Sequence, residues 1–315
     1  MQLKSFFQTM NDGTEIWTNR WIPDEDVKIK GVIQLHHGLE EHSLRYDAFG
    51  SFLTENGYVL NAYDMRGHGK TAENALEKGS GMFGKIADKK GSFKVVEDLD
   101  QVIENLKKDF PGVPVILFGH SFGSFVSQGY IEEHGEKING CVLCGTAGPM
   151  LAKSTAGKIF ASILNVFESD KKSKILASMA FDPFLKRIEK VETGQEWVCK
   201  NEMARSMYLD DKWCAFGLTT SFFKDLSTLL CRIHKSSSMK KIPKNLPVNM
   251  IYGSEDPVGA YGKSINKLYK IYENNGMSNL SIKVYEGDRH EILNEDDRYT
   301  VMEDVVSWIN LVLGQ

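Results

Sequence analysis

The stretch Val115-Ile-Leu-Phe-Gly-His-Ser-Phe-Gly-Ser-Phe125 places a G-x-S-x-G pattern between a short apolar run and a segment of helical character. Residues 115–118 are large and apolar, which is typical of a strand buried on both faces of a parallel sheet. Residues 124–133 are expected to form the helix that follows. With a strand before it and a helix after it, Gly119-His120-Ser121-Phe122-Gly123 predicts a tight turn that exposes a serine hydroxyl.

Both glycines of the pattern have a physical reason. A serine at the tip of such a turn is held in a strained backbone conformation. The residues two before and two after it nearly collide, and Gly119 and Gly123 are the smallest residues available. The helix N-terminus adds partial positive charge and free N–H groups beside the hydroxyl. We therefore predict that Ser121 is a catalytic nucleophile, rather than a serine without a role in a flexible turn.

A serine hydroxyl becomes a good nucleophile only when a base takes its proton. Of the eight histidines, His290 is the preferred base, because it follows a predicted strand at 281–285 and precedes a C-terminal helix. Asp256 lies in another loop after a strand, one β/α unit earlier, and is predicted to orient the imidazole. Glu255 is the alternative acid. The chain order Ser, Asp, His is the order found in α/β-hydrolases.

Acyl transfer to a serine also needs hydrogen-bond donors for the developing oxyanion. One expected donor is the backbone N–H of Phe122. The second is expected from Leu39, in the loop after a predicted strand at 31–35, where Gly38 lets the backbone bend inward. The pair His36-His37 in the same loop is also compatible with a metal site, but no third ligand stands at a suitable spacing. We therefore expect no metal and no cofactor.

The rest of the chain alternates short apolar runs with amphipathic helices. A hairpin is predicted around Asn11-Asp12-Gly13, between strands at 5–9 and 15–22. Further strands are expected at 31–35, 58–63, 115–118, 140–144, 248–252 and 281–285. Helices are expected at 93–110, 261–272 and 297–313. This alternation predicts an α/β fold with a mostly parallel central sheet and helices on both faces.

The alternation is interrupted between residues 149 and 235. That segment is rich in Met, Phe and Lys and is predicted to form several helices. We expect a helical cap over the carboxyl ends of the strands, where ligands bind to parallel sheets; extra helical packing is the alternative. The predicted organisation is therefore a core of residues 1–148 and 236–315 with a cap of residues 149–235.

Composition excludes several classes of protein. The chain of 315 residues is 42% hydrophobic and 25% charged, and its 38 Lys and Arg against 42 Asp and Glu give a net charge of −4. Such a balance argues against nucleic acid as a partner. No window is apolar enough to span a bilayer, and no signal peptide is evident, so we expect a cytoplasmic protein. The five cysteines favour reduced thiols. Cys141 and Cys144 have CxxC spacing, but they lie in an apolar strand and are expected to pack in the core.

Residues 79–85, Gly-Ser-Gly-Met-Phe-Gly-Lys, also match the phosphate-binding pattern G-x-x-x-x-G-K. Ile86 follows where a Ser or Thr is needed for Mg²⁺, and no apolar strand precedes the motif. We therefore reject nucleotide binding.

Several segments together resemble the α/β-hydrolase superfamily. They are HHGLEEHSLRY at 36–46, DMRGHG at 64–69, GHSFG at 119–123, GSEDPVG at 253–259 and GDRHEILNE at 287–295. More narrowly, the chain resembles the monoacylglycerol lipase and lysophospholipase branch, which is also described as serine aminopeptidase-like. The resemblance runs from about residue 14 to 308 and includes 197–200 and 210–220 in the cap. It implies a triad of Ser121, Asp256 and His290, with oxyanion donors from Leu39 and Phe122.

The expected function is hydrolysis of a lipid-like carboxylic ester through an acyl-enzyme on Ser121. Monoacylglycerols and lysophospholipids are the leading substrates, because a cap rich in Met and Phe suits an acyl chain. Lys171, Lys172 and Lys174 are candidates for transient contact with a lipid surface, although a run of charges is usually a solvated face. A short-chain carboxylesterase, an amide-cleaving hydrolase and a non-catalytic binding protein of the same fold remain as alternatives.

Overall fold

The computed structural model describes all 315 residues and has a single eight-stranded sheet. Its strands are β1 (Gln2–Thr9), β2 (Glu15–Ile22), β3 (Gly31–His36), β4 (Tyr58–Tyr63), β5 (Val115–His120), β6 (Gly140–Cys144), β7 (Val248–Gly253) and β8 (Leu280–Tyr285). The order across the sheet is β1-β2-β4-β3-β5-β6-β7-β8. β1 and β2 form the predicted hairpin and pair antiparallel. The six strands β3 to β8 all run parallel to one another. The mostly parallel α/β fold is therefore confirmed.

Strand β5 lies near the middle of the sheet, between β3 and β6. Its register pairs His36 of β3 with Gly119, and Cys144 of β6 with His120. The parallel strands β3 to β7 are buried along their whole length, as their near-continuous apolar sequences require. The carboxyl ends of β3, β5, β7 and β8 thus meet at one edge, and Leu39, Ser121, Asp256 and His290 each follow one of these strands.

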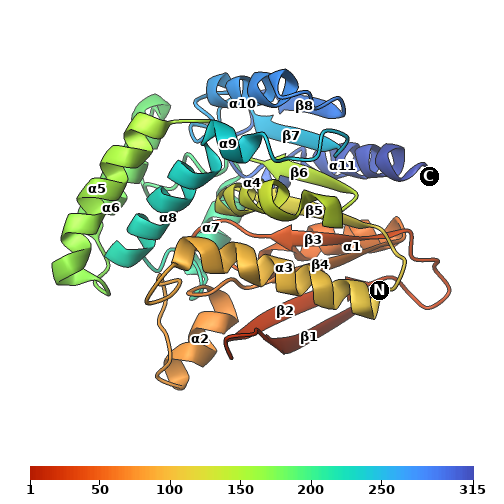
Figure 1. Cartoon of the computed structure of the whole chain (residues 1–315), viewed down its shortest axis with the longest axis horizontal. Helices are drawn as coiled ribbons and strands as arrows, with labels where there is room; N and C mark the ends of the chain where they lie inside the picture. The colour runs from red at the N-terminus through yellow and green to blue at the C-terminus, as the bar shows by residue number, and fades with distance from the viewer.

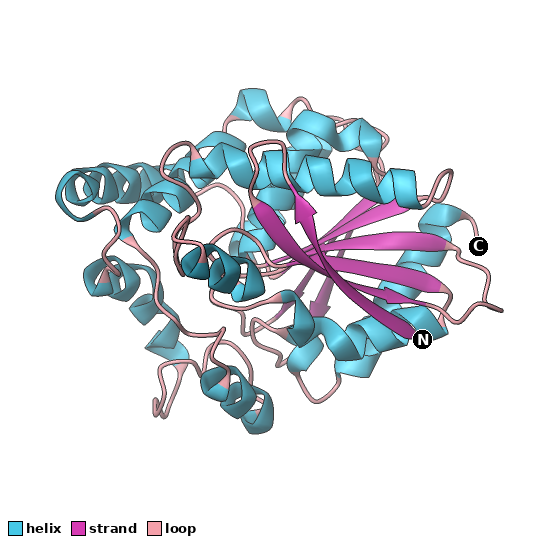
Figure 2. Cartoon of the chain, turned by 90° about the horizontal axis from the view of Figure 1, so that it is seen from below, coloured by secondary structure: helices cyan, strands magenta, loops and turns pink.

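Helices cover both faces of the sheet (Figure 2). They are α1 (Asp47–Glu55), α2 (Gly69–Glu77), α3 (Gly91–Asp109), α4 (Phe122–His134), α10 (Lys263–Asn274) and α11 (Arg298–Leu313), with short 3₁₀ turns η1 (Ser43–Tyr46), η2 (Gly135–Lys137) and η4 (Ile292–Asn294). Buried side chains of α3, α4 and α10 belong to one apolar cluster, and those of α1 and α11 belong to a second. The two clusters are the two faces of one sheet.

The segment between β6 and β7 contains helices and loops but no strand of the sheet. It contains α5 (Leu151–Glu168), α6 (Lys174–Phe181), η3 (Asp182–Arg187), α7 (Glu202–Asp210), α8 (Thr220–Ile233) and α9 (Ser236–Met239). Figure 1 shows α5 and α6 beyond one end of the sheet, with both chain termini on the opposite side. Helix α8 reaches into the main core, because Phe222, Leu229 and Ile233 belong to the same apolar cluster as α3 and α4.

The CxxC pair packs as predicted. Cys141 and Cys144 are both fully buried in β6 and form no disulfide. Cys141 belongs to one apolar cluster and Cys144 to the other, because residues three apart in a strand face opposite sides. Burial raises the pKa of both thiols. Each cysteine is a small apolar core residue.

The predicted strands and the three long helices at 93–110, 261–272 and 297–313 are all present within a few residues of their expected ends. Helices α1 and α2 were not among the predicted elements. Both are only nine residues long, and the apolar stripe of α2 is short and partly exposed. No helix of the structure is both long and apolar enough to cross a bilayer.

The candidate nucleophile Ser121 directly follows strand β5. The packing of β5 in the core therefore stabilises the site. Leu117 is fully buried there, and replacing it by Ala should lower the free energy of unfolding by about 2–5 kcal/mol, through lost burial and a residual cavity. The same change at Leu311, which is 79% exposed in α11, is the matched control and should cost little. Urea unfolding followed by circular dichroism measures both values. Equal losses in the two variants would contradict this description of the core.

Candidate active site

Ser121 lies at the turn between β5 and α4, with φ 53° and ψ −119°. This is the strained conformation expected for the tip of the turn. A side chain at Gly119 would collide with Ser127 and with the carbonyl of Gly123, and one at Gly123 would collide with the carbonyls of His36 and His37. Both glycines are therefore required by close backbone approach, and they let the end of β3 pack directly against the turn.

His290 and Asp256 form a hydrogen bond in the loops after β8 and β7. Nδ1 of His290 lies 2.9 Å from Oδ2 of Asp256, and the other carboxylate oxygen accepts from the N–H of Val258 at 2.9 Å. Asp256 is fully buried, and His290 is 3% exposed. Glu255, the alternative acid, is exposed and has no contact with the imidazole. The structure therefore brings Asp256, not Glu255, to His290.

Ser121 and His290 line the same cavity. Nε2 of His290 has no hydrogen-bond partner, so the Ser121–His290 bond that a general base needs is not formed in this structure. Catalytic hydrogen bonds are often loose in free enzymes and tighten when substrate binds. Nε2 is the ring nitrogen not bonded to Asp256, and it is buried and unpartnered in a residue that lines the cavity.

Leu39 and Phe122 also line this cavity, from the loop after β3 and from the first turn of α4. The N–H of Leu39 makes no hydrogen bond within the protein, and the first N–H groups of a helix lack intrahelical partners. The loop is held from below by His37, whose Nε2 accepts from the N–H of Met65 at 3.0 Å and whose Nδ1 donates to the carbonyl of Gly38 at 2.8 Å. Both of its ring nitrogens are engaged in shaping this loop.

A buried cluster of charges beneath the site was not predicted. Oε1 of Glu41 accepts hydrogen bonds from the N–H of Gly38 at 2.6 Å, the hydroxyl of Tyr46 at 2.9 Å and Nδ1 of His120 at 3.1 Å. Oε2 of Glu41 accepts from Arg45 at 2.7 Å. Glu41 is 2% exposed, so a single buried carboxylate gathers four donors.

Arg45 connects this cluster to the loop of His290. Its guanidinium makes two parallel hydrogen bonds of 2.7 Å to the carboxylate of Glu291, the residue after His290. Glu41 and Arg45 are four residues apart, with Glu41 in the loop before η1 and Arg45 within it. Glu291 lies 246 residues away, and only the fold places it there.

The charges of this cluster shift one another's titration. Burial favours the neutral form of Glu41, but the hydrogen bond from His120 and the charge of Arg45 outweigh it and hold the pKa of Glu41 well below its ordinary value. Burial likewise opposes protonation of His120, yet the hydrogen bond and charge of Glu41 raise its pKa. The centroids of the His120 and His290 rings are 5.0 Å apart. A protonated His120 would thus stand beside the candidate base.

The cavity over Ser121 has a volume of about 420 Å³, and 15 of its 27 lining residues are hydrophobic. The segment between β6 and β7 supplies much of this lining, including Met150, Phe181, Phe184, Trp197, Leu226 and Leu230. The Trp197 ring lies 5.2 Å from that of His290 and 4.9 Å from that of Phe184. The inserted segment therefore supplies apolar lining, and Trp197, in the turn between η3 and α7, reaches the candidate base itself.

Residues 196–200 of the inserted segment are hydrogen-bonded directly to the loop of His290. Arg289 donates to the carbonyl of Glu196 at 2.5 Å, and the N–H of Glu291 donates to the carbonyl of Val198 at 2.7 Å. The N–H of Lys200 donates to the buried carboxylate of Glu295 at 3.0 Å. This part of the inserted segment is thus fixed to the core next to the candidate base.

The phosphate-binding pattern at 79–85 has none of the expected context. It follows helix α2 rather than a strand, and no helix begins at its final lysine. Lys85 instead forms ion pairs with Asp88 and Asp170. These findings agree with the rejection of nucleotide binding.

The family model described as serine aminopeptidase, S33, matches residues 27–297. The chain is 26% identical over 303 residues to monoglyceride lipase of Mus musculus, covering 95% of this chain and 88% of the relative. It is 24% identical to monoacylglycerol lipase of Mycolicibacterium smegmatis, with coverage of 94% and 93%. A carboxyl esterase of Bacillus coagulans, solved with glycerol, is 27% identical with a TM-score of 0.88 and 99% coverage of both chains. The chain thus belongs to the serine aminopeptidase S33 family, in the monoacylglycerol lipase-like branch of the α/β-hydrolase superfamily, and is a serine hydrolase.

Proposed function

We propose that this enzyme hydrolyses carboxylic esters that carry an acyl chain, through an acyl-enzyme on Ser121. The observation that carries the proposal is the cavity of about 420 Å³ that is lined both by Ser121 and His290 and by apolar residues of the inserted segment. Cavities of this size accommodate small organic ligands, and an apolar lining with a few polar groups favours an acyl chain over a polar substrate.

In the proposed reaction, His290 takes the proton of the Ser121 hydroxyl as the oxygen attacks the ester carbonyl. The resulting tetrahedral intermediate collapses when His290 returns the proton to the leaving alcohol, which leaves an acyl group on Ser121. Water, activated by the same imidazole, then releases the acid and restores the serine. The buried carboxylate of Asp256 accepts from Nδ1, which fixes the useful tautomer and stabilises the imidazolium.

The N–H groups of Leu39 and Phe122 are the proposed donors to the oxyanion. We assign Glu41 a positioning role, because its carboxylate accepts from the N–H of Gly38, directly before Leu39. Holding the Gly38 N–H in this bond orients the next peptide unit, so that the Leu39 N–H is directed to the cavity before substrate arrives. Such preorganised donors stabilise charge that develops only in the transition state.

Monoacylglycerols and lysophospholipids are the proposed substrates, with residues 149–235 acting as a cap over the cavity. The names of the relatives from Mus musculus and Mycolicibacterium smegmatis support the first of these classes. The outer surface of α5 supports access from a lipid surface, since Ile163, Val166 and Phe167 are 56%, 76% and 81% exposed. The exposed Lys171 and Lys172 follow that helix. Transient contact of this surface with lipid would deliver an acyl substrate near the cavity.

A short-chain carboxylesterase is the second candidate. Its support is the likeness to the Bacillus coagulans carboxyl esterase, which spans nearly the whole of both chains. The two candidates share the same chemistry at Ser121 and differ in the length of acyl chain that the cavity prefers.

Hydrolysis of p-nitrophenyl esters from acetyl to palmitoyl distinguishes these functions. We expect turnover that is greatest for medium or long acyl chains, followed by turnover of monoacylglycerols. Ser121→Ala should lower kcat by about 10⁴-fold or more, because the nucleophile is lost while the cavity remains.

A maximum at acetyl or butyryl would favour the short-chain esterase. Near-normal turnover by Ser121→Ala would reject the assigned nucleophile. Absence of turnover at every chain length, in a folded protein, would redirect the proposal to amides or to ligand binding without catalysis.

Glu41→Gln tests the positioning role. The amide still offers an oxygen to Gly38, but it loses the charge that attracts Arg45 and His120. We expect kcat to fall by up to about 10²–10³-fold, the range measured for loss of one oxyanion donor, with a smaller change in KM. Glu97→Gln, at an exposed position in α3, is the control. A rise in KM with unchanged kcat would contradict a role for Glu41 in oxyanion binding.

The same variant gives a prediction for stability as a function of pH. The pKa of Glu41 is lowered by folding. Ionised Glu41 therefore contributes fully to the free energy of unfolding above pH 4.5, its ordinary pKa, and this contribution is lost as the pH falls through the pKa of the folded state. The pKa of His120 is raised by folding. Protonated His120 therefore contributes fully to the free energy of unfolding below pH 6.5, its ordinary pKa, and this contribution is lost as the pH rises through the pKa of the folded state. The difference in unfolding free energy between wild type and Glu41→Gln should therefore be largest between about pH 4.5 and 6.5. Urea unfolding across the pH range measures it, and a difference that keeps growing above pH 8 would contradict the coupling.

A further inference from the structure

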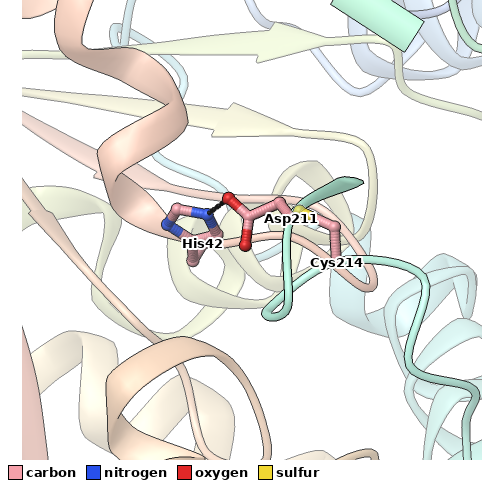
Figure 3. A group of neighbouring side chains, drawn as sticks. All are labelled: His42, Asp211 and Cys214. Carbon is pink, nitrogen blue, oxygen red and sulfur yellow. Dashed lines mark hydrogen bonds and ion pairs between the residues drawn. The ribbon is translucent and has the colours of Figure 1, made fainter. Parts of the chain in front are cut away.

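Three side chains that offer metal-binding atoms meet where the inserted segment contacts the loop after β3 (Figure 3). A ring nitrogen of His42, a carboxylate oxygen of Asp211 and Sγ of Cys214 all lie within 4.8 Å of one another. His42 comes from the loop that precedes η1, and the other two come from the turn after α7. We infer that His42, Asp211 and Cys214 form a site for a thiophilic divalent cation such as Zn²⁺.

The turn after α7 places two of the three ligands on the same side. The N–H of Cys214 donates to the carbonyl of Asp211 at 3.0 Å, which closes the turn. The N–H of Trp213 donates to Oδ1 of Asp211 at 2.7 Å. Oδ2 is thereby directed to His42, whose Nε2 lies 2.8 Å away. One carboxylate oxygen is held by the backbone, and the other is available as a ligand, an arrangement that orients metal-binding carboxylates.

His42 presents one ring nitrogen to the other two candidate ligands. Its side chain is buried, and its ring packs edge-on against Trp213 at 5.2 Å. Nδ1 has no hydrogen-bond partner, and Nε2 is the ring nitrogen that faces Asp211. A neutral imidazole with its proton on Nδ1 offers the Nε2 lone pair as a metal ligand on the side of Asp211.

The charge and chemistry of the ligands favour Zn²⁺ over harder cations. A thiolate, a carboxylate and a neutral imidazole around a divalent ion give no net charge, which limits the cost of burial. Zinc accepts all three ligand types in tetrahedral geometry, whereas Ca²⁺ and Mg²⁺ prefer oxygen ligands alone. His42 and Cys214 are buried, while the side chain of Asp211 is 29% exposed. That exposed edge offers the ion a way in and a place for a water as fourth ligand.

This site is separate from the reacting groups, because none of its three residues lines the cavity over Ser121. His42 nevertheless follows Leu39 by only three residues, and Asp211 and Cys214 belong to the inserted segment. A cation bound here would join that segment to the proposed oxyanion loop. The inference does not depend on the substrate proposed above.

Titration of the chelator-treated protein with Co²⁺ tests the site, since a thiolate ligand gives a charge-transfer band in the near ultraviolet. We expect a band that saturates at one Co²⁺ per chain and disappears when Zn²⁺ is added. Cys214→Ser should abolish the band, and Cys231→Ser should keep it. Cys231 is a partly buried cysteine in α8 and is the matched control.

Thermal unfolding gives an independent readout. Zn²⁺ should raise the Tm of the wild type and of Cys231→Ser, but not that of Cys214→Ser or His42→Asn. The Tm of each variant in chelator shows that it is folded. Absence of a band in the wild type, or an equal band and Tm shift in folded Cys214→Ser, would overturn the inference.

Discussion

The backbone of Ser121 is held at a positive φ between a central strand and a helix, and the rest of the candidate site is arranged around that turn. Such a conformation costs about 1–3 kcal/mol and persists only where the surroundings impose it. Here β5 is paired on both sides, and the two glycines let the end of β3 contact the first turn of α4. Leu39, in the loop after β3, and Phe122, in the first turn of α4, both line the cavity over Ser121. One packing constraint therefore positions both the hydroxyl and the two N–H groups proposed to bind the oxyanion.

A second constraint joins the loops that this turn does not reach. Glu41, Arg45 and Glu291 connect the loop after β3 to the loop that carries His290. Buried ion pairs often contribute little net stability, because desolvation offsets their attraction. Removing only one partner of a buried ion pair strongly lowers stability, because the other charge is left buried without a partner. The geometry of such pairs is also specific. We interpret this cluster as fixing the loop after β3 relative to the loop that carries His290. His120 joins the cluster through its hydrogen bond to Glu41.

The sequence was informative wherever the signal was local. The strand, turn and helix around Ser121, and the loops after β7 and β8, follow from apolar runs and glycine positions that are close in the chain. The pairing of His290 with Asp256 followed from their places after consecutive strands, and the structure brings the two together. The contact of Arg45 with Glu291 and that of Trp197 with His290 could not be predicted in this way. Each joins segments about 90 or more residues apart, and their spacing in the chain carries no periodic signal. The order of β4 and β3 in the sheet is likewise a property of the tertiary fold.

We propose that ester hydrolysis by this chain passes through a covalent intermediate on Ser121. Reaction with a fluorophosphonate, followed by mass spectrometry of the intact protein and its peptides, tests it most directly, because only an activated serine reacts readily. We expect one adduct per chain, on the peptide that contains Ser121, formed much more slowly in His290→Ala and not at all in Ser121→Ala. An unlabelled wild type that still hydrolyses esters, or an adduct on another residue, would contradict it.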